Sequence, residues 1–496
     1  MTGRAGAVFV AVDIGASSGR VILGRMGSDG PSLQIVHRFP NGAVEVDGTL
    51  RWDVHELFTQ VLAGLTLASG SLEPGERIAS VGVDTWAVDY GLLDDDGALA
   101  SLPFSHRDVR SETTVAGVHA LIPFERLYEI TGLQFLPFNT VYQLAAETSL
   151  DRQQALLVPD LLCFWLTGRR ASEATNASTT GLVDARTNDW APEIFTRLGL
   201  PSVLFPPLIQ PGQTLGILLP EVARSTGLPA DTSIVAVGSH DTASAVVAVP
   251  AASAAEKFAY ISSGTWSLVG VELDHPVVTP ASRSANFTNE RGIDGTIRYL
   301  RNVGGLWLLQ ECLRSWATGG EAPQLESLLA EAASQPADGP RIDVDSATFI
   351  PPGNMPARIL DAIRQAGGAA PADPAGVVRC ILDSLADAYA RTVRQAVDLS
   401  GAAVDVVHIV GGGSQNALLC QLTADATGLP VVAGPVEATA LGNVMVQVRA
   451  AGLLGEAASL TDIRAAVART ADTTRYTPHG PGSAPGVGPV ARNRCT

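Results

Sequence analysis

The segment that decides the fold reads Ala7-Val-Phe-Val-Ala-Val-Asp-Ile-Gly-Ala-Ser-Ser-Gly-Arg-Val-Ile-Leu-Gly-Arg25. Two apolar runs flank a Gly/Ser turn, and this pattern predicts two strands joined as a hairpin. A comparable unit occurs in the second half of the chain, at Phe258-Ala-Tyr-Ile-Ser-Ser-Gly-Thr-Trp-Ser-Leu-Val-Gly270. The recurrence of strand, Ser/Gly turn and strand indicates a duplicated architecture.

Apolar runs elsewhere predict a mixture of strands and helices. Buried strands are predicted at residues 78–83, 233–237, 404–410 and 429–433. Helices are predicted at residues 159–167, 304–316, 377–399 and 415–427, and Gly428 is predicted to end the last of them as a left-handed C-cap. The chain is therefore expected to belong to the α/β class.

The length of 496 residues exceeds what one hydrophobic core fills, so two domains are expected. An Ala/Pro/Ser-rich stretch before the second hairpin places the boundary after residue 248. We predict an N-terminal domain at 1–248, a C-terminal domain at 249–476, and a tail at 477–496 whose Gly/Pro-rich sequence indicates disorder.

The chain carries 33 basic and 50 acidic residues, a net charge of −17. This balance opposes attraction to nucleic acid or an anionic membrane, so we expect small-molecule ligands, no nucleic acid and no membrane. No apolar run reaches the ~18 residues of a membrane span, and the N-terminus lacks a secretory pattern, which predicts a cytoplasmic protein. Scattered cysteines without metal-ligand spacing favour reduced thiols: Cys163, Cys312, Cys380, Cys420 and Cys495.

The turn of the first hairpin offers a carboxylate, Asp13, followed by Ile-Gly-Ala-Ser-Ser-Gly and Arg20. Backbone N–H groups and hydroxyls of such a turn can wrap phosphate oxygens, and Asp13 could meet the accompanying Mg²⁺ through water. Thr265, in the second turn, could donate a hydroxyl to the same phosphates. An ordinary hairpin turn is the alternative, because Gly and Ser dominate turns for conformational reasons.

A strand enters three glycines in Ile409-Val-Gly-Gly-Gly-Ser-Gln-Asn416 and a helix follows. Backbone can approach a flat or anionic ligand closely at such glycines, although tight packing of strand against helix explains them equally well.

A further polar group, His240, Asp241 and Thr242, follows the strand predicted at 233–237. Ligands bind at the ends of α/β strands, and a carboxylate there can accept a hydroxyl proton, as phosphoryl transfer requires. The alternatives are that Asp241 N-caps the following helix and that His240 is a buried structural histidine.

The segment Gly82 to Tyr90 combines Asp84 and Asp89 with two aromatic residues, a mixture suited to the hydroxyls and apolar face of a sugar. Arg301 and Asn302 could place a guanidinium and an amide near a ligand. A core tryptophan beside a turn and ordinary surface polar groups are the alternatives.

Together these segments resemble the FGGY carbohydrate kinases, and most closely the branch that acts on L-rhamnulose, from about Val8 to Tyr476. The resemblance also rests on His37-Arg-Phe39, Asp84-Thr-Trp86, Leu136-Pro-Phe-Asn-Thr140, Ser239-His-Asp-Thr-Ala-Ser-Ala245, Asn286-Phe-Thr-Asn-Glu290, Gly305-Leu-Trp-Leu-Leu-Gln310 and Gly434-Pro-Val-Glu-Ala438.

The resemblance implies two ribonuclease-H-like (actin-like ATPase) domains with ATP and sugar in a cleft between them. It makes Asp241 the catalytic base and places the ATP-binding residues at Ala16, Ser17, Ser18, Gly19, Arg20, Thr265, Gln310 and Gly412. The sugar contacts it implies are Ala87, His240, Asp241, Thr242 and Asn302. Ala87 stands where glycine occurs in that branch, so a contact there uses the backbone.

The implied activity is ATP-dependent phosphorylation of the 1-hydroxyl of L-rhamnulose, with Mg²⁺, in L-rhamnose catabolism. The nearest alternative is another ketose kinase of the family, acting on fuculose, ribulose or xylulose. A non-catalytic sugar or nucleotide sensor of the same fold would need no base. The intact Ser239-His-Asp-Thr242 segment favours the enzyme.

Overall fold

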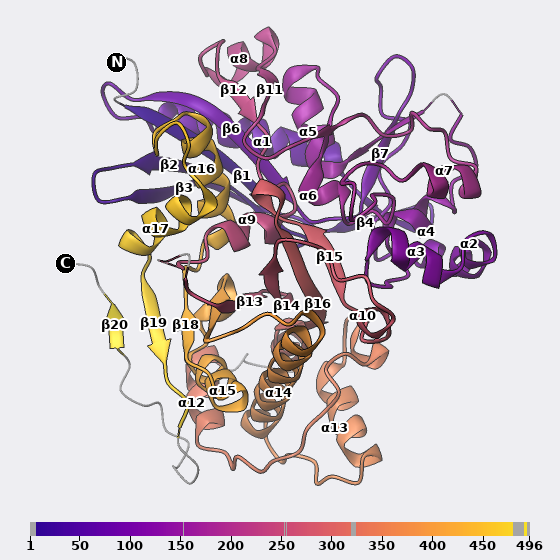
Figure 1. The fold of residues 1–496 in the computed structure, drawn as a ribbon. Coiled ribbons are helices and arrows are strands. Elements are labelled where there is room, and N and C mark those ends of the chain that lie inside the picture. The colour runs from indigo at the N-terminus through magenta and orange to yellow at the C-terminus, as the bar shows by residue number, and fades with distance from the viewer. Residues whose placement is uncertain are drawn as a thin grey trace. The chain divides into compact units, whose positions relative to one another are not determined.

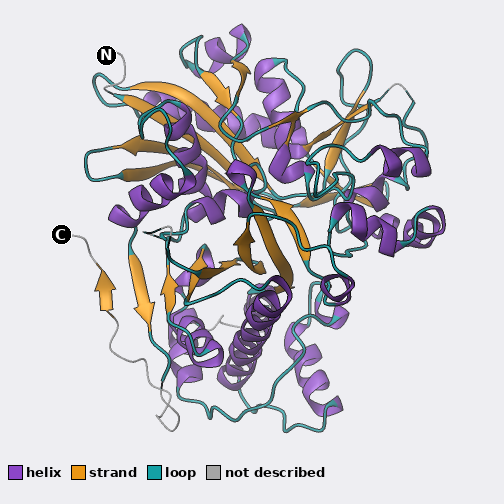
Figure 2. Cartoon of the chain, viewed as in Figure 1, coloured by secondary structure: helices purple, strands orange, loops and turns teal. Residues whose placement is uncertain are grey.

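The computed structural model describes residues 6–151, 153–251, 253, 255–318, 324–479 and 491–493, with helices and strands intermixed along the chain (Figure 2). The chain divides into two compact units. Unit 1 contains Met1–Ala248, Glu272–Tyr299 and Ala438–Thr470, and unit 2 contains Val249–Val271, Leu300–Glu437 and Ala471–Thr496. The domain limits inferred from the sequence remain predictions.

Unit 1 is built on a six-stranded sheet with the order β11-β12-β6-β1-β2-β3. Its strands are β1 Ala7–Ile14, β2 Ser18–Met26, β3 Pro31–Pro40, β6 Arg77–Thr85, β11 Thr214–Ile217 and β12 Ser233–Val235. β1 and β2 form the predicted antiparallel hairpin, whereas β6 runs parallel to β1 and β12 runs parallel to β6. The carboxyl ends of β1, β6 and β12 therefore meet at one edge of the sheet, where ligands bind in α/β folds.

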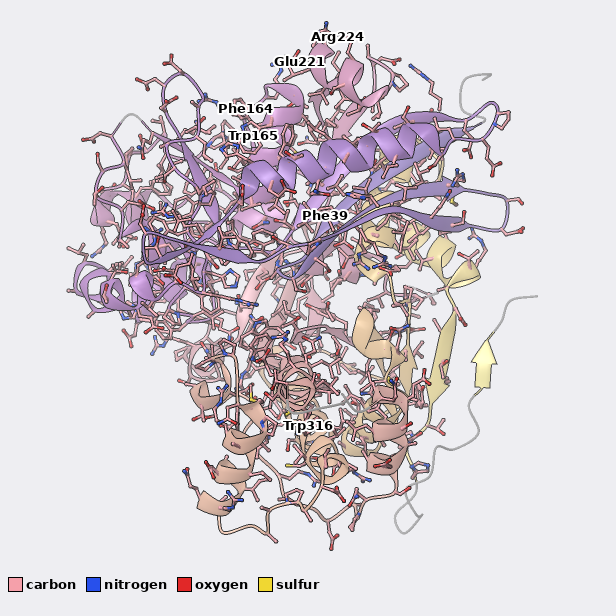
Figure 3. All side chains as sticks on the ribbon, turned by 180° about the vertical axis from the view of Figure 1, so that it is seen from behind. Phe39, Phe164, Trp165, Glu221, Arg224 and Trp316 are labelled. Atoms are coloured by element: carbon pink, nitrogen blue, oxygen red, sulfur yellow. The ribbon has the colours of Figure 1, made fainter. Side chains whose placement is uncertain are left out.

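Helices cover both faces of this sheet: α1 (Val54–Gly70) lies on one and α16 (Ala438–Ala450) on the other (Figures 1 and 3). A Cβ atom on Gly64 of α1 would meet Val21, and a Cβ atom on Gly24 would meet Val444 of α16. Residues 21 and 24 of β2 point to opposite faces because side chains alternate along a strand. Glycine at positions 24 and 64 is thus explained by the close approach of α16 and α1 to the two faces of the sheet.

The second sheet has the order β15-β16-β14-β13-β17-β18-β19-β20. Its strands are β13 Phe258–Ser263, β14 Trp266–Leu273, β15 Thr288–Arg291, β16 Ile297–Gly304, β17 Val406–Val410, β18 Val431–Ala433, β19 Thr473–Tyr476 and β20 Ala491–Asn493. β13 and β14 form the predicted second hairpin, and β17 and β18 continue parallel to β13. The order β16-β14-β13-β17-β18 repeats β3-β2-β1-β6-β12, so the predicted duplication is confirmed.

Three predicted helices are confirmed as α5 (Val158–Thr167), α14 (Pro374–Ser400) and α15 (Ala417–Thr427), and Gly428 ends α15 at a φ of 70°. The helix predicted from Gly304 instead begins at Trp307, as α11 (Trp307–Ala317), because β16 continues to Gly304.

The remaining elements are shorter connections and covering helices. The strands are β4 Ala43–Val46, β5 Thr49–Trp52, β7 Tyr90–Leu93, β8 Gln154–Leu157, β9 Ser172–Glu173 and β10 Leu208–Ile209. The α-helices are α2 Val115–Leu121, α3 Phe124–Thr131, α4 Thr140–Leu144, α6 Ala174–Ala177, α7 Pro192–Leu198, α8 Pro220–Thr226, α9 Asp241–Val247, α10 Pro280–Ser284, α12 Leu325–Ala333, α13 Met355–Gln365 and α17 Leu460–Thr470.

The predicted tail at 477–496 is described only at 477–479 and 491–493, where β20 pairs antiparallel with β19. Its other residues, Cys495 among them, lie outside the described residues. The four cysteines that the structure describes, Cys163, Cys312, Cys380 and Cys420, are buried free thiols, as predicted. Along the described part of the chain, every helix is too short or too polar to cross a membrane.

Candidate active site

Two carboxylates lie side by side at the sheet edge of unit 1. Asp13 on β1 pairs in register with Asp84 on β6, and both are buried. Arg20 Nη2 donates to Asp13 Oδ2 at 2.7 Å, and Asn443 Nδ2 of α16 donates to Asp84 Oδ2 at 2.6 Å. Gln447, one turn further along α16, donates to Asn443 Oδ1 at 2.7 Å. The hydrogen bonds from Gln447 to Asn443 and from Asn443 to Asp84 therefore fix the orientation of the Asp84 carboxylate.

Burial raises the pKa of Asp84 well above its usual value, and the nearby charges of Asp13 and Asp241 raise it further. Its Oδ1 atom is buried and has no hydrogen-bond partner among the described residues. An unpartnered carboxylate oxygen beside a second carboxylate fits a divalent cation. Within the described ranges no three His, Cys, Asp or Glu side chains gather as a metal cluster. The site fits Mg²⁺ held by one or two carboxylates, water and phosphate rather than by a protein cage.

The turn after Asp13 is held rigidly. Asn41 donates through Nδ2 to Gly15 O at 2.8 Å and through its backbone N to Ser17 O at 3.1 Å. Gly19 is buried, and a Cβ atom there would lie 2.2 Å from the ring of Phe39, which Figure 3 labels. Ser17 and Ser18 are exposed and Ala16 is half-buried. Ala16 and Ser17 thus lie in an ordered turn next to Asp13, Ser18 to Arg20 begin β2, and Ser17 and Ser18 are accessible.

Asp241 is the first residue of α9, and its side chain is 32% exposed. The N-cap position belongs to His240, and no side-chain hydrogen bond caps this helix. The alternative interpretation of Asp241 as the N-cap is therefore wrong. Its Oδ1 atom accepts a hydrogen bond from Thr242 Oγ1 at 3.1 Å, while Thr85 N donates to Ser239 O at 2.9 Å and ties this loop to β6.

The loop before Asp241 is clamped by a buried carboxylate, Glu173, at the end of β9. Its Oε2 atom accepts from Ser239 N at 3.0 Å and from Ser239 Oγ at 2.7 Å. The same carboxylate accepts from the backbone N of Thr175 and of Asn176 and from the Thr175 hydroxyl. Burial raises the pKa of Glu173, although these donors oppose the shift. Glu173 thus joins α6 to the loop that carries Asp241.

His240 lies in a buried ionic cluster. Its Nδ1 atom is 3.2 Å from Glu290 Oε2, and Arg298 Nη2 lies 3.0 Å from the same oxygen. Burial alone would raise the pKa of Glu290, but Arg298 and His240 bring it below its usual value. The other ring nitrogen, Nε2, is 3.6 Å from Asp241 Oδ1. The cluster therefore fixes the His240 ring beside the proposed base.

In the segment Gly82 to Tyr90, which was predicted to contact sugar, Ala87 is half-buried and its neighbour Trp86 is buried. The suggestion that Asp89 serves sugar hydroxyls is not supported, because protein donors occupy its carboxylate. Oδ2 accepts from Trp52 Nε1 at 2.6 Å and from Trp86 Nε1 at 2.9 Å, and Oδ1 accepts from Gln143 Nε2 at 3.0 Å.

Unit 2 brings together Thr265, Gln310 and Gly412 around the second hairpin turn. Trp307 N, at the start of α11, donates to Thr265 O at 3.1 Å, and Gln310 is exposed one turn along that helix. The glycine loop after β17 packs against the end of β13, because a Cβ atom on Gly413 would clash with Ser263 Oγ. The neighbouring Gly412 is exposed, with open space around it.

Asn302 is half-buried on β16 in unit 2. Its neighbour Arg301 forms an ion pair with Asp345 at 2.7 Å.

Sequence reasoning missed the residues that support the site: Glu173, Glu290, Arg298 and Asn443. Glu290 ends the segment Asn286-Phe-Thr-Asn-Glu290, and the fully buried polar run at 172–180 contains Glu173. A run of Ser, Thr and Asn is, however, typical of a surface loop. Asn443 gave no signal, because a polar residue in a helix is ordinarily exposed.

The fold is that of solved sugar kinases. The xylulose kinase of Lactobacillus acidophilus, in a ligand-bound crystal structure, is 17% identical and superposes with a TM-score of 0.75, covering 95% of this chain and 94% of that one. Glycerol kinase of Plasmodium falciparum, solved with ADP, gives a TM-score of 0.72 at 15% identity and covers 93% of this chain and 92% of that one. The predicted fold class, two ribonuclease-H-like, actin-like domains, is confirmed.

Sequence comparison narrows the class. The N-terminal domain of the FGGY family of carbohydrate kinases matches residues 8–248 and its C-terminal domain matches residues 259–451. A rhamnulokinase of Bacteroides thetaiotaomicron is 41% identical over 95% of this chain and 96% of its own length. One of Klebsiella pneumoniae is 42% identical over 95% and 94%. The chain belongs to the FGGY family of carbohydrate kinases, which confirms the resemblance found in the sequence.

Proposed function

We propose that the protein transfers the γ-phosphoryl group of ATP to the 1-hydroxyl of L-rhamnulose and releases ADP and L-rhamnulose 1-phosphate. The observation that carries this proposal is the 41–42% identity to rhamnulokinases along 95% of the chain. Its reactants are small molecules, and no nucleic-acid or membrane partner is proposed. The reaction would take place in the cytoplasm, as a step of L-rhamnose catabolism.

Asp241 is the proposed general base. Its partly exposed carboxylate can accept the proton of the 1-hydroxyl as the oxygen attacks the γ-phosphorus in line. The Glu173 contacts to Ser239 support this role, because they hold the loop in one position before substrate arrives.

Sugar contacts are proposed at Ala87, His240, Asp241, Thr242 and Asn302. The buried positions of His240 and Thr242 support this assignment, because a polar group that is held in place discriminates strongly against a substrate lacking its partner.

The nucleotide is proposed to bind through Ala16, Ser17, Ser18, Gly19 and Arg20 in unit 1 and through Thr265, Gln310 and Gly412 in unit 2. Asp13 is the proposed carboxylate for Mg²⁺, through a bridging water, and Asp84 lies beside it. When bound, Mg²⁺ supplies positive charge to the phosphate oxygens. The ordered turn next to Asp13 and the open space at Gly412 support these roles.

The test is an ADP-release assay with Mg²⁺ and ATP across L-rhamnulose, L-fuculose, L-ribulose and D-xylulose. We expect the highest kcat/KM with L-rhamnulose, and product analysis should find the phosphate on carbon 1. Equal or better turnover of another ketose would reassign the substrate. ATP hydrolysis without any phosphorylated ketose would overturn the kinase proposal.

A further inference from the structure

Two motifs of the sequence, Asp84-Thr-Trp86 and Leu136-Pro-Phe-Asn-Thr140, contribute aromatic residues to one cluster. The structure brings both to one histidine, His106. Its ring centroid lies 5.5 Å from that of Phe138 and 6.1 Å from that of Trp52, and the Trp52 and Trp86 centroids lie 4.2 Å apart. The imidazole thus sits in an aromatic wall that contains both motifs.

One edge of the His106 ring is fixed by Asp89. Nδ1 lies 2.8 Å from Asp89 Oδ2, which also accepts from the His106 backbone N at 3.2 Å. Burial alone would raise the pKa of Asp89, but His106 and the donors of Gln143 and Trp52 bring it below its usual value. An ionised carboxylate only accepts hydrogen bonds, so Nδ1 carries the proton and donates it.

The other nitrogen of the ring, Nε2, has no hydrogen-bond partner among the residues that the structure describes. The side chain is 15% exposed, whereas Asp89 is completely buried. Nε2, the ring nitrogen without the proton, is therefore a hydrogen-bond acceptor at the protein surface. Because Asp89 already fixes the ring, the side chain loses little conformational freedom when it binds a ligand.

This cluster is joined to the proposed sugar contacts. The amide of Asn176 lies 3.5 Å from Trp86 O and 3.3 Å from Ser239 O, which precedes His240. Between Ala87 and Asp89, Val88 has a φ of 69°, a left-handed conformation that a β-branched residue rarely adopts. Thr140 Oγ1 donates to Val88 O at 2.7 Å and helps to hold it there. A strained backbone conformation of this kind is retained only where surrounding contacts hold it, and such positions are common at ligand-binding sites.

We propose that Nε2 of His106 binds a hydroxyl of the ketose and that the surrounding aromatic rings contact the apolar side of the same sugar. Aromatic side chains with a few fixed polar groups are the usual lining of a small-molecule site. The inference rests on the proposed function, since it assigns a specificity residue to the same substrate.

The test compares two substitutions that separate the two ring nitrogens. In His106→Asn the amide stands where Nδ1 was, so it can still donate to Asp89, but the Nε2 position is lost. In His106→Gln the amide reaches the Nε2 position instead. We expect His106→Asn to raise KM for L-rhamnulose, and Kd by titration calorimetry without ATP, about tenfold, the effect of one lost hydrogen bond. KM for ATP should stay within about twofold, and His106→Gln should restore most of the ketose affinity.

His55→Asn is the matched control, because His55 is exposed and stacks on Trp165 with centroids 5.4 Å apart. It should leave KM for the ketose unchanged. Wild-type ketose affinity in folded His106→Asn would overturn the proposal while leaving the proposed function intact. A wild-type enzyme that turns over no ketose would instead overturn the proposed function.

A second measurement does not depend on the folding of a variant. Diethyl pyrocarbonate acylates accessible unprotonated ring nitrogens, and peptide mass spectrometry can locate the modified histidines in the wild-type protein. L-rhamnulose should protect His106 and leave His55 reactive, whereas ATP should protect neither. Equal modification of His106 with and without the ketose would overturn the proposal.

Discussion

Asp241 is the residue on which the proposed chemistry depends. Asp241→Asn keeps the size of the side chain but cannot take up a proton, so kcat should fall about 10²- to 10⁴-fold. Because the side chain caps no helix, Tm and the affinity for ATP should stay close to wild type. Asp398→Asn, at an exposed position of α14, is the matched control and should leave kcat unchanged. Wild-type turnover in folded Asp241→Asn would remove Asp241 from the mechanism.

Asp84 illustrates a conflict between stability and function. Its pKa is raised by burial and by Asp13 and Asp241, so the folded state holds its proton more tightly than the unfolded state does. Stability is then lost as pH rises from the unfolded value near 4 through the raised folded value, and the penalty is complete above it.

Asp84→Asn removes that charge. Without Mg²⁺ and ATP, its Tm should exceed that of wild type by about 2 °C or more at pH 8, the shift expected from roughly 1 kcal/mol in a domain of this size. The advantage should vanish near pH 4, where both proteins are neutral at this position. Tm measured by calorimetry between pH 4 and pH 8 checks this, and a constant difference at every pH would contradict it.

At the scale of elements, Glu173 connects β9 and α6 to the loop before α9. In Glu173→Gln an amide NH₂ would face donors on Ser239, Thr175 and Asn176, and leaving buried donors unpaired costs about 1–3 kcal/mol. We expect a lower Tm together with a lower kcat, since the loop holding Asp241 loses its clamp. Glu221→Gln, on the exposed surface of α8 and labelled in Figure 3, is the control and should change neither. An unchanged kcat at a reduced Tm would restrict Glu173 to a structural role.

At the scale of the whole molecule, the ketose is proposed to bind mainly through unit 1 and the nucleotide through both units. Bound ligand lowers the frequency of local opening, so hydrogen exchange reports where each one binds. L-rhamnulose alone should slow exchange mainly in unit 1, at residues 84–89 and 239–242. A non-hydrolysable ATP analogue should slow exchange at 16–20, 263–266 and 411–415. Protection of 411–415 by the ketose alone would contradict the assignment of this segment to the nucleotide.

The local part of the fold was predictable from the sequence. Both hairpins, α14 and the end of α15 at Gly428 follow from apolar runs and from turn or cap residues a few positions away. The helix at 304–316 was misplaced at its start, because Gly304 belongs to β16 and strand pairing with distant residues decided its conformation. Asp13, His240 and Asp241 could be proposed from the sequence because they lie at the ends of apolar strands, where ligands bind in α/β folds.

The sequence alone determined the family, the duplicated strand pattern and the residues that carry the proposed chemistry, because each of these is written in short contiguous segments. Only the tertiary structure decided how those residues are supported. Asn443 reaches Asp84 across 359 positions and Glu173 reaches Ser239 across 66. Asp89 turned out to be a buried acceptor for four protein side chains rather than a free sugar ligand. Such contacts depend on strand register and helix packing, which bring together residues whose neighbours in the chain give no sign of one another.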